Sequence, residues 1–207
     1  SLIGFYLVNG SIRKDSDTNV GQIIAATNIK NFRYLFSRAL SNFLMLIIIM
    51  GLVFLMSIAL FFLYNEGYPF ELFQFIKPYT FITIPALFVI SVLALVFEVF
   101  FGKYSVLQHI GFFFLFATLM IFSPKTEHQF SLDIFGSKIV LHQLEESVKK
   151  ITNTDKNSNL SIGFVLGNTT KPNKFLFNGI DFSTAFLWSR LGWIILCVLL
   201  LFLVSAL

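Results

Sequence analysis

The chain has 207 residues, of which 56% are hydrophobic and only 13% charged, and its mean hydropathy is +0.79. Soluble domains carry roughly a quarter charged residues, so this composition excludes an ordinary soluble domain and requires lipid as well as a core. The formal net charge of +4 is modest, and a single cysteine, Cys197, allows no disulfide framework or cysteine metal motif within the chain.

Both ends of the chain lie in apolar sequence. Residues 1–8 (SLIGFYLV) are interpreted as the end of a transmembrane span whose start is missing, and residue 207 also lies inside an apolar run. A secretory signal would show a basic start followed by a cleavage site, and neither occurs here. The native protein is therefore expected to continue beyond both ends.

Residues 9–39 form the first polar segment and carry five basic residues against two acids. Within it, residues 21–36 place apolar side chains on one helical face and basic ones on another, which predicts an amphipathic helix at the membrane surface that runs into the next span. Two interpretations remain open: a basic linker that lies at the lipid headgroups, or a docking element for a cytoplasmic partner.

Four complete spans follow from the apolar runs at residues 40–64, 79–101, 105–123 and 185–207. Each has about the 20 apolar residues that a helix needs to cross a bilayer. Pro85, in the second of these runs, is expected to kink its helix. The excess of Lys and Arg predicts that residues 9–39 are cytoplasmic, and the alternation then places residues 124–184 outside.

The long loop at residues 124–184 is predicted to be a small folded cap. Residues 141–151 (LHQLEESVKKI) repeat apolar side chains at spacings of three and four, which indicates a short amphipathic helix. Later apolar runs, at residues 160–166 and 175–177, suit short strands. The segments are thus the end of a span at 1–8, a cytoplasmic segment at 9–39, three transmembrane helices within 40–123, the loop domain at 124–184 and a final span at 185–207.

Three ionisable residues fall within the predicted spans: Glu98, His109 and Arg190. An ionisable group inside a span is a functional hypothesis by default because burying it in lipid is costly. Glu98 and His109 lie on either side of a tight hairpin and are close enough in sequence to pair. Their interpretations are a proton or substrate relay, or a structural hydrogen bond at the interface. Arg190, between Trp188 and Trp193, is interpreted mainly as an interfacial anchor.

Enzyme signatures are missing from the sequence. His128 and His142 are too far apart for a local metal motif, and no phosphate-binding glycine loop or nucleophile elbow occurs. We therefore expect no catalytic residues, no cofactor, no metal site and no nucleic-acid partner.

The segment IRKDSDTNVGQIIAATNIKNFRYLFSRAL at residues 12–40 resembles the region after the second span of type-2 ABC transporter permeases. That family shows a charged stretch, then a short apolar run ending in Ala-Thr-Pro, then a helix entering the next span. QIIAAT at residues 22–27 matches the run, and Asn28 replaces the usual proline. The short hairpin around residue 102, the large outer loop and the last span are similar to a Bacteroidetes-like subgroup of these permeases.

This resemblance implies a permease half in a bacterial inner membrane. A second permease half and cytoplasmic ABC ATPase subunits would complete the transporter, and ATP would bind those subunits. The fold implied is all-α: a polytopic transmembrane helix bundle with an amphipathic cytoplasmic coupling helix and a small α+β extracytoplasmic cap. The residues that would meet the ATPase are Arg13, Lys14, Gln22, Ile23, Ile24, Thr27, Lys30 and Arg33.

Two other classes of protein compete with the permease. The first is a non-transporting membrane anchor, sensor or assembly protein with an outer cap, which the layout of spans also fits. The second is a membrane-embedded enzyme that uses Glu98 and His109. An ATPase subunit that copurifies with the chain would separate the permease from both.

Overall fold

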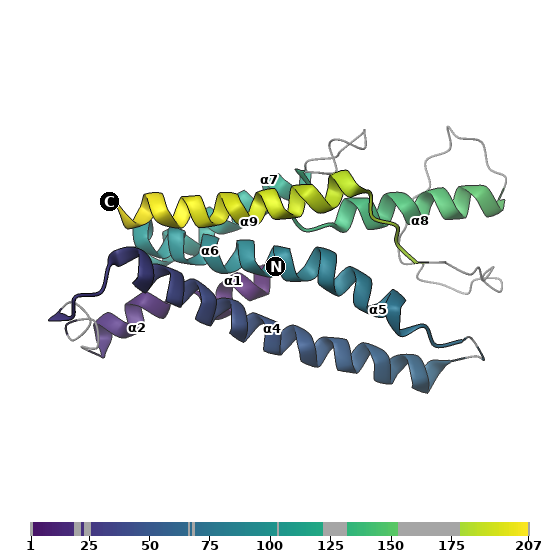
Figure 1. Ribbon diagram of the computed structural model, residues 1–207, viewed down its shortest axis with the longest axis horizontal. Coiled ribbons are helices and arrows are strands. Elements are labelled where there is room, and N and C mark those ends of the chain that lie inside the picture. The colour runs from purple at the N-terminus through teal and green to yellow at the C-terminus, as the bar shows by residue number, and fades with distance from the viewer. Residues whose placement is uncertain are drawn as a thin grey trace.

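A computed structural model describes residues 2–18, 22, 26–65, 67, 69–102, 104–121, 132–152 and 179–206, and within them the fold is helical with no strand (Figure 1). This confirms the expected all-α class for that part of the chain. In chain order the elements are α1 (Leu2–Val8), α2 (Ser11–Asp17), α4 (Asn31–Tyr64), α5 (Leu72–Pro78), the π-helical turn η1 (Tyr79–Thr83), α6 (Ile84–Phe101), α7 (Ser105–Ile121), α8 (Ser137–Thr152) and α9 (Thr184–Ser205).

Three helices are long and apolar enough to cross a membrane: Asn31–Tyr64, the combined helix Leu72–Phe101, and Thr184–Ser205. They contain most or all of three of the predicted spans, so the prediction of an α-helical membrane protein is confirmed. The fourth predicted span forms α7, which has 17 residues and is shorter than the others. At about 1.5 Å per residue, α4 alone is about 50 Å long and therefore extends beyond the hydrocarbon core.

Helix α6 lies at the centre of the bundle, in contact with α1, α2, α4, α7 and α9. Apart from Ser91 and Glu98, its sequence is apolar on every face, which is typical of a helix surrounded by other helices. Val92, Ala94 and Leu95 are fully buried there. By contrast, most of the apolar surface of α4 is exposed, so α4 forms a face of the bundle suited to lipid or to another subunit.

The irregularity expected at Pro85 takes the form of the π-helical turn η1. Proline has no N–H to donate, so a regular helix cannot continue unchanged through it. The backbone widens just before Pro85, and the N–H of Ile84 bonds to the carbonyl of Tyr79. Turns of this kind inside helices relieve such conflicts and often mark functional regions.

The helix predicted over residues 21–36 is not continuous. Residues 27–30 are not helical, and Lys30 adopts an extended backbone with φ −67° and ψ 138° directly before α4. Residues 31–36 are therefore the first turns of the long helix α4. Gln22 and Ala26 are helical, whereas Ile23 and Ile24 lie outside the described residues.

The helix predicted at residues 141–151 is confirmed as part of α8, which starts four residues earlier and ends one later. The strands predicted for the rest of the cap fall within residues 153–178, which lie outside the described residues.

The bundle has two distinct ends (Figure 1). One end holds α2, the start of α4 and the C-terminal end of α9, where the Asn31 side chain lies 3.5 Å from the carbonyl of Ser205. The other end holds α5 and α8. We call these the α2 end and the α8 end.

Candidate functional site

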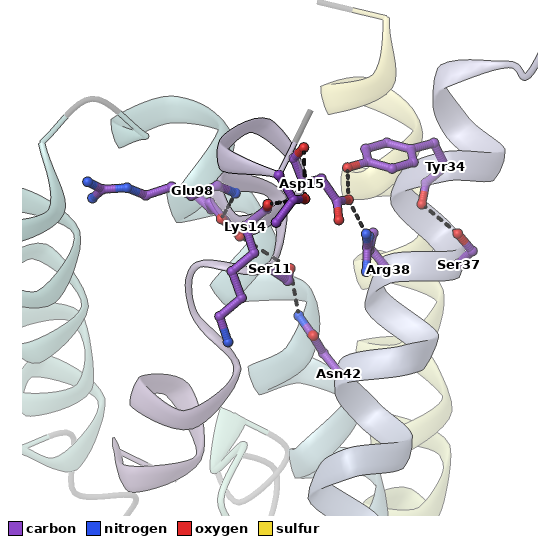
Figure 2. Close-up of polar contacts among 10 residues, drawn as sticks. Ser11, Lys14, Asp15, Tyr34, Ser37, Arg38, Asn42 and Glu98 are labelled. Carbon is purple, nitrogen blue, oxygen red and sulfur yellow. Dashed lines mark hydrogen bonds and ion pairs between the residues drawn. The ribbon is translucent and has the colours of Figure 1, made fainter. Parts of the chain in front are cut away.

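The α2 end contains a polar cluster in which Glu98 holds α2 against the central helix. Glu98 projects from the last turn of α6 and is only 4% exposed. One carboxylate oxygen accepts a hydrogen bond from the backbone N–H of Arg13 at 2.8 Å, and the other lies 3.4 Å from the Ser11 hydroxyl (Figure 2). The first N–H groups of a helix have no partner within it, and the Glu98 carboxylate satisfies that of Arg13.

A second set of contacts fixes α2 to α4. Asp15 is buried, accepts a hydrogen bond from the Tyr34 hydroxyl at 2.7 Å and forms an ion pair with Arg38. Further along α4, the amide of Asn42 lies 3.5 Å from the Ser11 hydroxyl. Figure 2 shows these groups converging on α2 from α4 and α6. The short helix is therefore held between the two long ones by polar groups on both sides.

A polar pocket of about 260 Å³ lies beside this cluster. On its wall the Asn9 side-chain amide donates to the side-chain carbonyl oxygen of Gln108 at 2.9 Å, which joins the end of α1 to α7. The His109 ring packs against Tyr6, with 5.0 Å between ring centroids. The lining residues are Tyr6, Asn9, Gly10, Arg13, Lys14, Glu98, Gln108 and His109.

The structure therefore brings Glu98 and His109 to the wall of one pocket, together with Arg13 and Lys14. Glu98 accepts its hydrogen bonds from groups of α2, which favours the structural interpretation of this carboxylate. The other predicted docking residues that the structure describes do not line the pocket. Lys30 and Arg33 are exposed at the start of α4, as are Gln22 and Thr27 before it.

Arg190 belongs to the opposite end, and its burial favours a structural role over the anchoring interpretation. An interfacial anchor would extend to the lipid headgroups, but Arg190 is only 4% exposed. Its guanidinium donates to the backbone carbonyls of Asp133 and Ile134 at 2.6 and 2.8 Å and lies 4.0 Å from the Phe186 ring centroid. Arg190 instead fixes the loop before α8 to the bundle, because a buried guanidinium needs acceptors that this loop provides.

That loop forms a compact corner. The Asp133 carboxylate accepts from the backbone N–H groups of Lys138 and Ile139 at 2.7 and 3.3 Å, and so caps the first turn of α8. Gly136 has φ +67°, and a Cβ added there would lie 2.3 Å from a methyl group of Ile82. Arg190, Asp133 and Gly136 together set the position of α8.

Sequence reasoning missed the partners that complete the α2 cluster, because each is unremarkable in its own segment. Asp15 was one of two acids in a basic stretch, and Arg38 one of five basic residues. Asn42 carried the clearest unused signal, since it is a polar amide within an apolar run and is only 7% exposed. Among the described residues, no group of three or more His, Cys, Asp or Glu side chains is arranged to hold a metal ion.

The chain matches no family model, no curated protein and no solved structure.

Proposed function

We propose that this chain is the membrane-spanning permease subunit of an ATP-driven ABC transporter in a bacterial inner membrane. In this proposal residues 9–39 are cytoplasmic, and the exposed start of α4 meets the ATPase subunit. A second permease half completes the membrane pathway. ATP is bound and hydrolysed by the partner subunit.

The observation that carries the proposal is the polar connection from the start of α4 to the centre of the bundle. Lys30 and Arg33 are exposed where a partner would bind, and Arg38 lies one to two turns further along the same helix. Arg38 pairs with Asp15 on α2, and α2 is bonded to Glu98 on α6. Coupling between distant sites is carried by packed helices and hydrogen-bond networks, and this connection is a route of that kind from the α4 start to the central helix.

An ATPase pull-down and activity assay tests the proposal. The Lys30→Glu/Arg33→Glu double variant reverses charge on the exposed start of α4 without touching the buried cluster. We expect it to lose copurification with a cytoplasmic ABC ATPase subunit, and to lose most ATP hydrolysis stimulated by the permease in proteoliposomes. Lys77→Glu, on α5 at the α8 end of the bundle, is the matched control and should behave as the native chain does.

Two results would contradict the proposal. If no ATPase subunit copurifies with the native chain, the non-transporting anchor or assembly protein becomes the better interpretation. If an ATPase copurifies but the double variant changes neither binding nor ATP hydrolysis, the start of α4 is not the coupling element.

A further inference from the structure

We propose that the polar pocket at the α2 end binds a phosphate ester that carries a free hydroxyl group, such as a phosphoglycerol headgroup. The pocket is lined by Tyr6, Asn9, Gly10, Arg13, Lys14, Glu98, Gln108 and His109. This inference does not depend on the proposed transport function, since its ligand is not the ATPase, although the pocket shares Glu98 and α2 with the connection described above.

The charge of the pocket favours an anion. Arg13 and Lys14 contribute two cationic side chains against one carboxylate, Glu98. Both oxygens of that carboxylate face groups of α2, which lie at 2.8 and 3.4 Å, so its charge is already partly compensated. In Figure 2 the Lys14 side chain extends away from the ion pair of Asp15 and Arg38. Lysine and arginine side chains arranged around a small cavity are typical of phosphate recognition.

The size of the pocket favours a small polar group. Its volume of about 260 Å³ is below the roughly 300–1,000 Å³ typical of sites for drug-sized ligands. A phosphate with a short polyol and some ordered water fits that space.

One polar atom in the wall points to a hydroxyl on the ligand. The Asn9 amide nitrogen donates to Gln108, while its carbonyl oxygen is buried with no hydrogen-bond partner in the described part of the chain. A buried acceptor without a donor costs about 1–3 kcal/mol. A small shift of the Asn9 side chain would bring this oxygen to the pocket; a glycerol hydroxyl then donates to it, whereas a phosphate diester without hydroxyl groups cannot.

The surroundings of the pocket suit a ligand that arrives from the membrane. Two of the helices that line the pocket, α1 and α7, present exposed apolar side chains beside the lining residues. Leu7 follows Tyr6 on α1 and is 46% exposed, and Ile110 follows His109 on α7 and is 47% exposed. Acyl chains could lie along these side chains while the headgroup enters the pocket. A soluble phosphate ester would use the same polar groups without them.

Native mass spectrometry of the full chain tests the inference. The protein is reconstituted in phosphatidylcholine vesicles containing phosphatidylglycerol, extracted in mild detergent, and its retained lipid is counted. The Arg13→Gln/Lys14→Gln double variant keeps the backbone N–H that bonds to Glu98. We expect it to retain phosphatidylglycerol at least about tenfold more weakly, because charge-assisted hydrogen bonds are lost. Arg33→Gln, an exposed cation at the same end, should retain the lipid as the native chain does.

Two further probes identify the source and the chemistry of the ligand. Displacement of the retained lipid by millimolar glycerol 1-phosphate would assign the pocket to a soluble ester, and failure of displacement would assign it to the lipid. Phosphatidylmethanol has the same charge without a headgroup hydroxyl and should be retained several-fold less well than phosphatidylglycerol. Equal retention of these two lipids would overturn the role given to Asn9.

The inference as a whole fails on either of two results. One is that the native chain and the Arg13→Gln/Lys14→Gln variant retain the same amount of both the lipid and the soluble ester. The other is that Arg33→Gln lowers retention as much as the pocket variant does, since general surface charge would then explain binding. Thermal unfolding of each variant confirms that it is folded before retention is compared.

Discussion

The Glu98 carboxylate on α6 accepts a hydrogen bond from the backbone N–H of Arg13 on α2, at 2.8 Å. The two residues are 85 positions apart in the sequence. This contact joins a short polar helix to the most buried helix of the bundle, and it uses a backbone group of α2, so no particular side chain at residue 13 is needed.

Removing the Glu98 carboxylate should loosen α2. Glu98→Ala leaves the first-turn N–H of α2 without its acceptor, and we expect a loss of about 1–3 kcal/mol in the free energy of unfolding. Glu98→Gln keeps one carbonyl oxygen and should lose less. Hydrogen exchange of peptides spanning residues 11–18 measures the loosening, and Glu146→Ala on the exposed face of α8 is the control. Unchanged exchange in Glu98→Ala would show that this contact does not hold α2.

The ion pair between Asp15 and Arg38 should be energetically coupled. The Asp15 and Arg38 side chains are 11% and 29% exposed, so solvent screens the pair only partly. A double-mutant cycle with Asp15→Ala and Arg38→Ala, read by thermal or chemical unfolding in detergent, should give a coupling energy of about 1 kcal/mol. Additive effects of the two substitutions would mean that the pair contributes nothing beyond the separate residues.

Tyr34→Phe offers a narrower test of the same cluster. It removes only the hydroxyl that donates to Asp15 and leaves the ring in place. We expect a loss of about 1 kcal/mol in the free energy of unfolding, the usual net value of one hydrogen bond. In the Asp15→Ala background the same substitution should cost much less. An equal cost in both backgrounds would show that the hydroxyl does not act through Asp15.

The Arg190→Lys substitution should not preserve the contacts that arginine makes at the α8 end. Two backbone carbonyls accept hydrogen bonds from separate N–H groups of one planar guanidinium, and a lysine ammonium does not reproduce that two-pronged geometry. We expect both Arg190→Lys and Arg190→Gln to lower the free energy of unfolding, the latter by about 2–4 kcal/mol. Limited proteolysis between residues 132 and 136 reports the release of the corner. Native behaviour of Arg190→Lys would instead support a role for charge alone, as in an interfacial anchor.

Gly136→Ala should also disturb the position of α8. The added methyl group meets Ile82, and the positive φ of this residue costs a non-glycine side chain about 1 kcal/mol or more. The Ile82→Ala substitution opens the space but leaves the backbone strain. The Gly136→Ala substitution should therefore cost less stability in the Ile82→Ala background than in the native chain, but it should still cost some. If Gly136→Ala costs nothing in the Ile82→Ala background, the contact with Ile82, and not the backbone strain, accounts for the lost stability.

The helices themselves followed from the sequence because lipid-spanning segments must be continuous apolar runs with their backbone bonds satisfied internally. That requirement is local, so residues 40–64, 79–101 and 185–207 identified three of the helices without any tertiary information. Amphipathic spacing likewise identified α8. The predicted helix at 21–36 failed between residues 27 and 30, where the backbone extends before α4 and no hydrophobic pattern marks the break.

Single ionisable residues in apolar runs were also visible in the sequence, but their partners were not. Glu98 and Arg190 stood out because a charge in a span is costly, and both prove to be buried. The sequence could not show that Glu98 bonds to α2 or that Arg190 bonds to the loop before α8, because these contacts join segments that are more than 50 residues apart. Hydropathy determines which segments form the long helices in this protein. Only the packing of those helices decides which polar groups meet, because a buried charge is satisfied by whatever donor or acceptor the neighbouring helix brings within hydrogen-bonding distance.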